Sequence, residues 1–310
     1  MKNNIVPVEI AQKVFKDSNL PSIGKAGIRE INKLARDLEA ASGVKFIHME
    51  MGNPGLLAVK AGVEAQIKAL QDGVAATYPP IDGVPTIKKE ASRFIKNFLD
   101  LDVDAANCLP TVGSMQGAFA SFMICGHTNK EKDTVLFIDP GFPVHKFQTK
   151  ILGLKMESFD IYEYRGEKLR EKLESIFSTG KIHSVLYSNP NNPTWVCLTD
   201  EELKIIGELA NKYDVIILED LAYFGMDFRK DYSHPGVAPF QPTVGKYTDN
   251  YILMLSTSKA FSYAGERCAV LGISNKLAER RYPDLKEFCG QDIFARGIIF
   301  GALHPLSSGT

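Results

Sequence analysis

Short runs of apolar residues alternate with amphipathic stretches along most of the chain after residue 50. The runs are rich in Val, Ile and Leu and do not alternate between apolar and polar positions. Continuous apolar runs of this kind are typical of strands buried on both faces of a parallel sheet. We therefore predict strands at Thr134–Ile138, Ile182–Tyr187, Val215–Glu219, Tyr251–Leu255 and Cys268–Ile273.

Between these strands, apolar residues spaced three and four apart predict amphipathic helices. Two of them cover Ile87–Leu99 and Glu167–Phe177, and a third follows Thr199 and Asp200, which match a helix N-cap. The alternation of strands and helices predicts right-handed β-α-β units. The expected fold is therefore α/β, a mostly parallel central sheet with helices on both faces.

Residues 1–50 have a different pattern. They include a helix-like stretch at Ile28–Ala40 and a break at Ser42-Gly43. We expect an N-terminal arm and part of a small domain in residues 1–50, followed by one large domain in residues 51–310. A chain of 310 residues is long enough for this organisation.

Composition narrows the functional classes. A net charge of -1 at pH 7 argues against nucleic-acid binding, which needs a concentrated basic surface. The five cysteines are scattered and form no CxxC pair, so we expect neither disulfides nor a zinc site, and a reducing cytoplasm. The six histidines form no ligand-spaced pair, and no metal is assigned. Neither a signal peptide nor a membrane-spanning apolar run is visible.

Candidate chemistry follows the predicted strands. In open parallel sheets, ligands bind beyond the carboxyl ends of the strands. The groups found there are an amide, an acid, a phenol, a hydroxyl, a lysine and an arginine. They belong to Asn192, Asp220, Tyr223, Ser256, Lys259 and Arg267, and Gly113-Ser114 opens a further predicted helix.

Pyridoxal phosphate needs this set of groups. Its aldehyde needs a lysine for a Schiff base, and its ring nitrogen needs a carboxylate that keeps it protonated. Its ring hydroxyl needs neutral or phenolic donors. Its phosphate needs the N–H groups of a helix start together with a cation.

Three motifs occur in the expected order: NPNNPT at residues 189–194, D-x-A-Y from Asp220 to Tyr223, and S-x-S-K-x7-R from Ser256 to Arg267. On these motifs, residues 50–310 resemble the class I/II aminotransferases of fold type I, the aspartate aminotransferase-like enzymes that use pyridoxal 5'-phosphate. Together the motifs are specific, although each alone is weak.

The resemblance implies a role for each matching residue. Lys259 would form the internal aldimine and then move the proton of the substrate alpha carbon, and its pKa would be lowered by desolvation and by Arg267. Asp220 would pair with the ring nitrogen. Asn192 and Tyr223 would hydrogen-bond the ring hydroxyl. The phosphate would be held by the backbone N–H groups of Ser114 and Met115, the Ser256 hydroxyl and Arg267.

Three further residues match the family more loosely. Phe142 corresponds to the aromatic residue that stacks on the cofactor ring. Tyr78 corresponds to a tyrosine that reaches the phosphate of the neighbouring subunit, which implies a homodimer. Gly52 corresponds to a loop against the substrate carboxylate, to which Asn192 also lies close. The implied reaction moves an amino group between an amino acid and a 2-oxo acid.

Other readings remain open from the residues alone. The same cofactor motifs serve lyases and decarboxylases, and a non-catalytic cofactor-binding protein would share them too. Asp220 could cap a helix, Asn192 could make a turn, and Arg267 could form a structural ion pair. Phe142 and Tyr78 could be core residues. Gly113-Ser114 could be an ordinary helix start, and S-x-x-K also occurs in penicillin-binding enzymes, whose companion motifs are absent.

The sequence departs from the family at three places. Trp195, the only tryptophan, stands where the family usually has glycine. His145 stands where many relatives have an aromatic residue, with a substrate contact or a polar surface position as the alternatives. The chain ends at Thr310, so we expect the C-terminal small domain to be absent. The arginine of that domain, which grips the substrate carboxylate, has no match here.

Overall fold

The computed structural model of the chain describes residues 5–307 and divides into two compact units, Met1–Gly55 and Leu56–Thr310. The first unit contains α1 (Val8–Asp17), a 3-10 turn (Ile23–Lys25) and α2 (Ile28–Ser42), and its two α-helices contact each other. The helix predicted at Ile28–Ala40 is confirmed. It ends at Gly43, which adopts a left-handed φ of 71° that glycine tolerates without strain.

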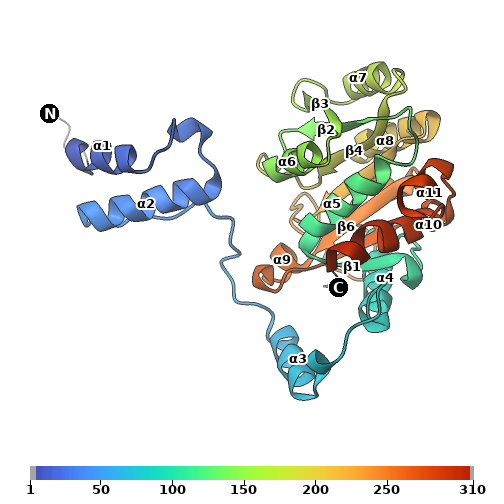
Figure 1. The fold of residues 1–310 in the computed structure, drawn as a ribbon, viewed down its shortest axis with the longest axis horizontal. Helices are drawn as coiled ribbons and strands as arrows, with labels where there is room; N and C mark the ends of the chain where they lie inside the picture. Colours follow the sequence, from blue (N-terminus) through green and yellow to red (C-terminus); the bar gives the residue numbers. More distant parts are fainter. Residues whose placement is uncertain (1–4, 308–310) are drawn as a thin grey trace. The chain divides into compact units, whose positions relative to one another are not determined.

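The second unit is built on a seven-stranded sheet with the strand order β1-β7-β6-β5-β4-β2-β3 (Figure 1). The strands are β1 (Cys108–Val112), β2 (Thr134–Asp139), β3 (Lys155–Asp160), β4 (Ile182–Ser188), β5 (Ile216–Leu221), β6 (Tyr251–Ser256) and β7 (Cys268–Ile273). All five predicted strands are confirmed.

Helices precede, connect and follow the strands. They are α3 (Lys60–Gln71), α4 (Pro85–Leu99), α5 (Gly113–Cys125), α6 (Pro143–Ile151), α7 (Glu167–Phe177), α8 (Asp200–Tyr213), α9 (Thr257–Ala260), α10 (Asn275–Glu279), α11 (Pro283–Cys289), α12 (Phe294–Arg296), a π-helix (Gly297–Leu303) and α13 (His304–Ser307). Short 3-10 turns lie at Val74–Ala76, Ala105–Asn107, Val244–Lys246 and Ala264–Glu266. The N-cap predicted at Thr199 is confirmed, because its hydroxyl accepts a hydrogen bond from the Glu202 N–H.

The two strands that the pattern did not reveal lie at the edges of the sheet. Only Phe159 is buried in β3, so that strand has no continuous apolar run. Pro110 interrupts β1 and provides no backbone N–H, which an edge strand tolerates.

One strand runs against the others. β7 pairs antiparallel with both β6 and β1, whereas β2, β3, β4, β5 and β6 are mutually parallel. The physical reason is the short connection of residues 257–267, because a parallel crossover needs a dozen residues or more. Consequently the beginning of β7 lies at the same edge of the sheet as the ends of its parallel neighbours.

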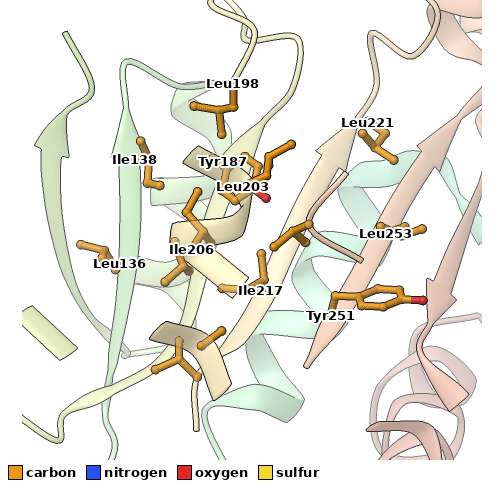
Figure 2. Packing of buried hydrophobic residues seen from close by; sticks show 14 of the residues in the cluster. Leu136, Ile138, Tyr187, Leu198, Leu203, Ile206, Ile217, Leu221, Tyr251 and Leu253 are labelled. Atoms are coloured by element: carbon orange, nitrogen blue, oxygen red, sulfur yellow. The ribbon is translucent and has the colours of Figure 1, made fainter. Parts of the chain in front are cut away.

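Both faces of the sheet are covered by helices. On one face, α4, α7 and α8 pack on alternate strand residues. Figure 2 shows part of this layer, with Leu203 and Ile206 of α8 beside Tyr187 and Ile217 of the strands. On the other face, α5, α10, α11, α12 and the π-helix pack on the intervening strand residues, among them Leu218 and Met254. This two-sided burial explains the continuous apolar runs. No helix within residues 5–307 is long and apolar enough to cross a membrane.

A carboxyl group lies inside the hydrophobic layer that contains Tyr187. Glu219 on β5 is fully buried and accepts hydrogen bonds from the Thr243 hydroxyl at 2.5 Å, the Val244 N–H at 3.2 Å and the Tyr187 hydroxyl at 3.4 Å. Burial disfavours the charged form and raises the pKa of Glu219 to about 7, although these hydrogen bonds oppose that shift.

Glu219 therefore links stability to pH. Between its ordinary pKa of 4.5 and about 7, the folded chain binds a proton that the unfolded chain has released. The contribution of Glu219 to the free energy of unfolding falls as the pH rises through this window, by roughly 3 kcal/mol at most. We predict that Glu219→Gln removes this slope in urea unfolding measured from pH 5 to 8. The exposed Glu163→Gln is the control, and an unchanged slope in Glu219→Gln would contradict the assignment.

Candidate functional site

Five strand ends meet at one edge of the sheet. Ser188 at the end of β4 pairs with Asp220, and Leu221 at the end of β5 pairs with Leu255. Because β7 is antiparallel, its first residue Cys268 pairs with Val112 at the end of β1. The residues that follow β1, β4, β5 and β6, and the residue that precedes β7, therefore lie along the same edge of the sheet.

Asp220 provides a buried carboxylate at this edge. Its exposed fraction is 6%, and its Oδ1 accepts a hydrogen bond from the Ala222 N–H at 3.0 Å. Residues 222–225 form turns rather than a helix, so Asp220 caps no helix. Its second oxygen, Oδ2, lies 3.4 Å from Nε2 of His145. This carboxylate is thus held in one orientation from two sides.

His145 is the residue whose role the sequence did not reveal. It lies in α6 with an exposed fraction of only 2%, so the expectation of a polar surface position is wrong. Its ring meets that of Phe142 edge to face with the centroids 5.9 Å apart. Within residues 5–307, its Nδ1 has no hydrogen-bond partner. The one available signal was the spacing of three residues from Phe142, which places side chains on one side of a helical turn.

Lys259 lies in the one-turn helix α9, which Ser256 caps by accepting a hydrogen bond from the Ser258 N–H at 3.2 Å. The Lys259 Nζ is 5.9 Å from the centre of the Tyr223 ring. Desolvation, and secondly the positive charge of Arg267, lower the pKa of the Lys259 amine. Its neutral, nucleophilic form is therefore more populated than that of a solvated lysine.

Tyr223 lies beside the lysine and within the electrostatic influence of Asp220. Burial raises the pKa of its phenol, and the charge of Asp220 adds to that shift. The phenol therefore stays protonated and can donate a hydrogen bond.

A candidate anion site lies at the start of α5, where Arg267 packs on the helix. A Cβ added to Gly113 would stand 2.4 Å from Nη2 of Arg267, so the guanidinium packs directly on this glycine. The backbone N–H groups of Ser114 and Met115 belong to the first turn of a 13-residue helix and have no acceptor within the helix. A helix N-terminus combined with a guanidinium suits a phosphate.

Arg267 is held in place by neutral partners. Its Nη1 donates to the Ala264 carbonyl oxygen at 2.9 Å and lies 3.5 Å from the Ser258 hydroxyl. Both hydrogen-bond partners of Arg267 are neutral, so they do not support the hypothesis that Arg267 forms a structural ion pair with a carboxylate. Gly113 and Arg267 both adopt left-handed φ angles, 72° and 55°, which bring them together.

The NPNNPT loop is organised by Asn191. Its amide donates to the Pro140 carbonyl oxygen at 2.8 Å and accepts from the Thr194 hydroxyl at 2.7 Å. The backbone N–H of Asn192 donates to the Ser188 hydroxyl at 3.2 Å. The Asn191 side chain therefore makes the hydrogen bonds of this turn, and the residue that follows it, Asn192, is half-buried.

The three loosely matched residues differ in their placement. Phe142 is half-buried and contacts His145, which joins it to Asp220. Tyr78 is 95% exposed, so it is not a core residue. Gly52 belongs to the first unit, and its position relative to the site remains a prediction.

Comparison with known proteins identifies the family to which the chain is similar. The model of the family "Aminotransferase class I and II" matches residues 44–296. The chain is 28% identical over 260 residues to a probable aspartate aminotransferase of Methanocaldococcus jannaschii, covering 84% of this chain and 64% of that one. It is 27% identical over 258 residues to an aspartate aminotransferase of Pyrococcus horikoshii, covering 83% and 61%. The chain thus spans less than two thirds of these relatives.

Solved structures agree in fold. The aspartate aminotransferase from Thermus thermophilus with maleate superposes with a TM-score of 0.66 at 18% identity, covering 95% of this chain and 72% of that one. An aminotransferase from Mycobacterium tuberculosis gives a TM-score of 0.67 at 20% identity, covering 83% and 62%.

The lowered pKa of Lys259 can be tested by its reactivity. We predict that reductive methylation with formaldehyde and cyanoborohydride modifies Lys259 at lower pH than the exposed Lys168. Arg267→Gln removes a positive charge, so the pKa of Lys259 rises and its half-maximal labelling moves to higher pH. Peptide mapping by mass spectrometry measures both lysines in one sample. A Lys259 profile that is unchanged in Arg267→Gln would contradict the assigned influence of Arg267.

Proposed function

Since the chain belongs to the class I and II aminotransferases, we propose that it transfers an amino group between an amino acid and a 2-oxo acid with pyridoxal 5'-phosphate. Aspartate aminotransferase-like members of this family use that cofactor. The observation that supports the proposal is the arrangement of Asp220, Lys259 and the Arg267–Gly113 anion site along one edge of the sheet. Relatives that match this chain have names of amino-transferring enzymes.

The residues fit each part of the cofactor. The start of α5 and Arg267 would hold its phosphate, and the missing Cβ of Gly113 gives the guanidinium its place there. Ser256 adds a hydroxyl at the end of β6. Phe142 would stack on the ring, next to His145. The donors are thus of the right chemical kind for an aromatic phosphate ester.

When bound, the cofactor supplies an electron-withdrawing ring that stabilises negative charge at the substrate alpha carbon. Asp220 would hold the proton of the ring nitrogen by charge pairing. His145 and the Ala222 N–H fix the orientation of that carboxylate. His145 therefore acts on the reaction through Asp220, as a positioning residue.

Lys259 would bind the cofactor and then move a proton at the alpha carbon. Both tasks need a neutral amine, which its lowered pKa provides. Tyr223 and the Asn192 amide would hydrogen-bond the ring hydroxyl, with the Tyr223 phenol in its protonated form as a donor. In this account Lys259, Asp220 and Tyr223 are the catalytic residues.

Two further parts of the proposal concern regions around this site. Gly52 and Asn192 would lie against the substrate carboxylate. Tyr78, with an exposed fraction of 95%, would reach the phosphate site of a second copy of the chain in a homodimer. A cytoplasmic location belongs to the same proposal.

The central experiment combines binding with turnover. We predict that the chain incubated with pyridoxal 5'-phosphate turns yellow, and that borohydride then fixes the cofactor to Lys259. In a panel of amino donors and 2-oxo acid acceptors, we expect at least one pair to react, with activity lost by several orders of magnitude in Lys259→Ala. A label on another lysine would refute the site. Conversion of an amino acid without any need for an acceptor would favour a lyase or decarboxylase instead.

The anion site has a test of its own. We predict that Gly113→Ala weakens the binding of pyridoxal 5'-phosphate by roughly tenfold or more. The new methyl group would strain a left-handed backbone and displace the Arg267 guanidinium. Gly265→Ala is the matched control, since a Cβ there meets nothing within 4 Å. Affinities can be measured from the cofactor absorbance. Equal losses in the two variants would exclude the contact between Gly113 and Arg267 as the cause.

A further inference from the structure

Trp195 extends the site beyond the groups that the cofactor requires. Its ring meets the Tyr223 ring edge to face, with the centroids 5.7 Å apart. On its other side it stacks on Phe228, with centroids 6.3 Å apart and an interplanar angle of 13°. Since Lys259 lies 5.9 Å from the Tyr223 ring, the two aromatic side chains begin one ring away from the reactive amine.

Both aromatic side chains remain accessible. Trp195 is 44% exposed and Phe228 is 79% exposed, so their stacked faces do not belong to the core. Trp195 also adopts a left-handed φ of 61°, which is an outlier for a bulky residue. Such strain persists only where the surrounding structure imposes it, and it is concentrated at functional sites.

The loop that contains Trp195 and the loop that contains Phe228 are connected by hydrogen bonds from a guanidinium that also forms an ion pair. The Asp227 carboxylate is buried and binds the Arg229 guanidinium at 2.6 Å. The same guanidinium donates to the carbonyl oxygens of Cys197 at 3.2 Å and Leu198 at 3.0 Å. The loop that contains Phe228 is thereby tied to the loop that contains Trp195, so the aromatic surface exists before any ligand binds.

The charge beside this surface does not favour an acidic ligand. Arg229 and Lys230 directly follow Phe228; Asp227 already neutralises Arg229, and Lys230 is exposed to solvent. A second carboxylate, such as the side chain of a dicarboxylic amino acid, would therefore gain little there, because a solvated ion pair contributes little to binding. A flat apolar side chain would instead gain stacking contacts and bury exposed aromatic surface.

We propose that Trp195 and Phe228 form a specificity wall that contacts the side chain of the amino donor and selects aromatic over acidic side chains. This inference rests on the proposed function and adds the substrate class to it. At this position the family usually has glycine, which could not provide such a contact.

Trp195 is the only tryptophan, so its fluorescence reports this wall alone. The probes are 3-phenylpropionate and succinate, which lack an amino group and cannot react. In the cofactor-loaded chain, we expect 3-phenylpropionate to change the Trp195 emission and to bind roughly tenfold or more tightly than succinate. Equal affinities for the two probes would overturn the proposal.

Variants then separate a specificity role from a structural one. Trp195→Gly relieves the left-handed strain, so we expect it to fold, with thermal unfolding as the check. Binding of the two probes to the variants is monitored by the cofactor absorbance. Trp195→Gly and Phe228→Ala should lose most of the preference for 3-phenylpropionate. Tyr162→Ala, which changes an exposed aromatic residue outside the site, should keep that preference. In Trp195→Gly, KM for phenylalanine should rise about tenfold more than KM for alanine.

The outcomes distinguish the two proposals. A chain that binds no cofactor and converts no amino acid refutes the proposed function, and the Trp195 titration of the unloaded chain still decides whether the wall prefers the aromatic probe. A chain that transfers amino groups but responds equally to both probes keeps the proposed function and refutes the wall.

Discussion

The antiparallel pairing of β6 with β7 is the constraint on which the site depends. The short connection of residues 257–267 cannot cross the sheet, so the chain turns back at the edge where β6 ends. Lys259 at the beginning of this connection and Arg267 at its end therefore stay at one edge. Because β7 also pairs with β1, Arg267 comes to lie on Gly113 at the start of α5. One reversal of direction thus places the Lys259 amine near the Arg267 guanidinium and the start of α5.

Two adjacent carboxyl groups on β5 show how the sheet separates structure from chemistry. Successive residues of a strand point to opposite faces, so Glu219 enters one hydrophobic layer while Asp220 faces the site. Glu219 is surrounded by neutral donors, and burial raises its pKa. Asp220 instead meets His145 and a backbone N–H, which hold its carboxylate in one orientation. The surroundings of Glu219 thus favour a protonated, buried carboxyl group, whereas those of Asp220 suit a carboxylate that binds a cation.

Left-handed backbone conformations occur at several positions around the site, among them Gly113, Arg267 and Trp195. Gly113 needs its φ of 72° to start α5 beneath Arg267, and Arg267 itself has a φ of 55°. Trp195 has a φ of 61° and presents its ring beside Tyr223. The strain at Arg267 and Trp195 is balanced by packing elsewhere in the large unit, whose two hydrophobic layers cover the sheet on both sides.

The sequence by itself determined the burial pattern and the order of the chemical groups. Continuous apolar runs predicted β2, β4, β5, β6 and β7 because each is covered on both faces, and the cap at Thr199 predicted α8 because its hydrogen bonds are local. Only the tertiary structure decided the direction of β7, the edge strands β1 and β3, and the contacts of His145 and Trp195. These features depend on pairing and packing between segments distant in the chain, and the residue pattern within one segment does not specify which partner it meets or in which direction.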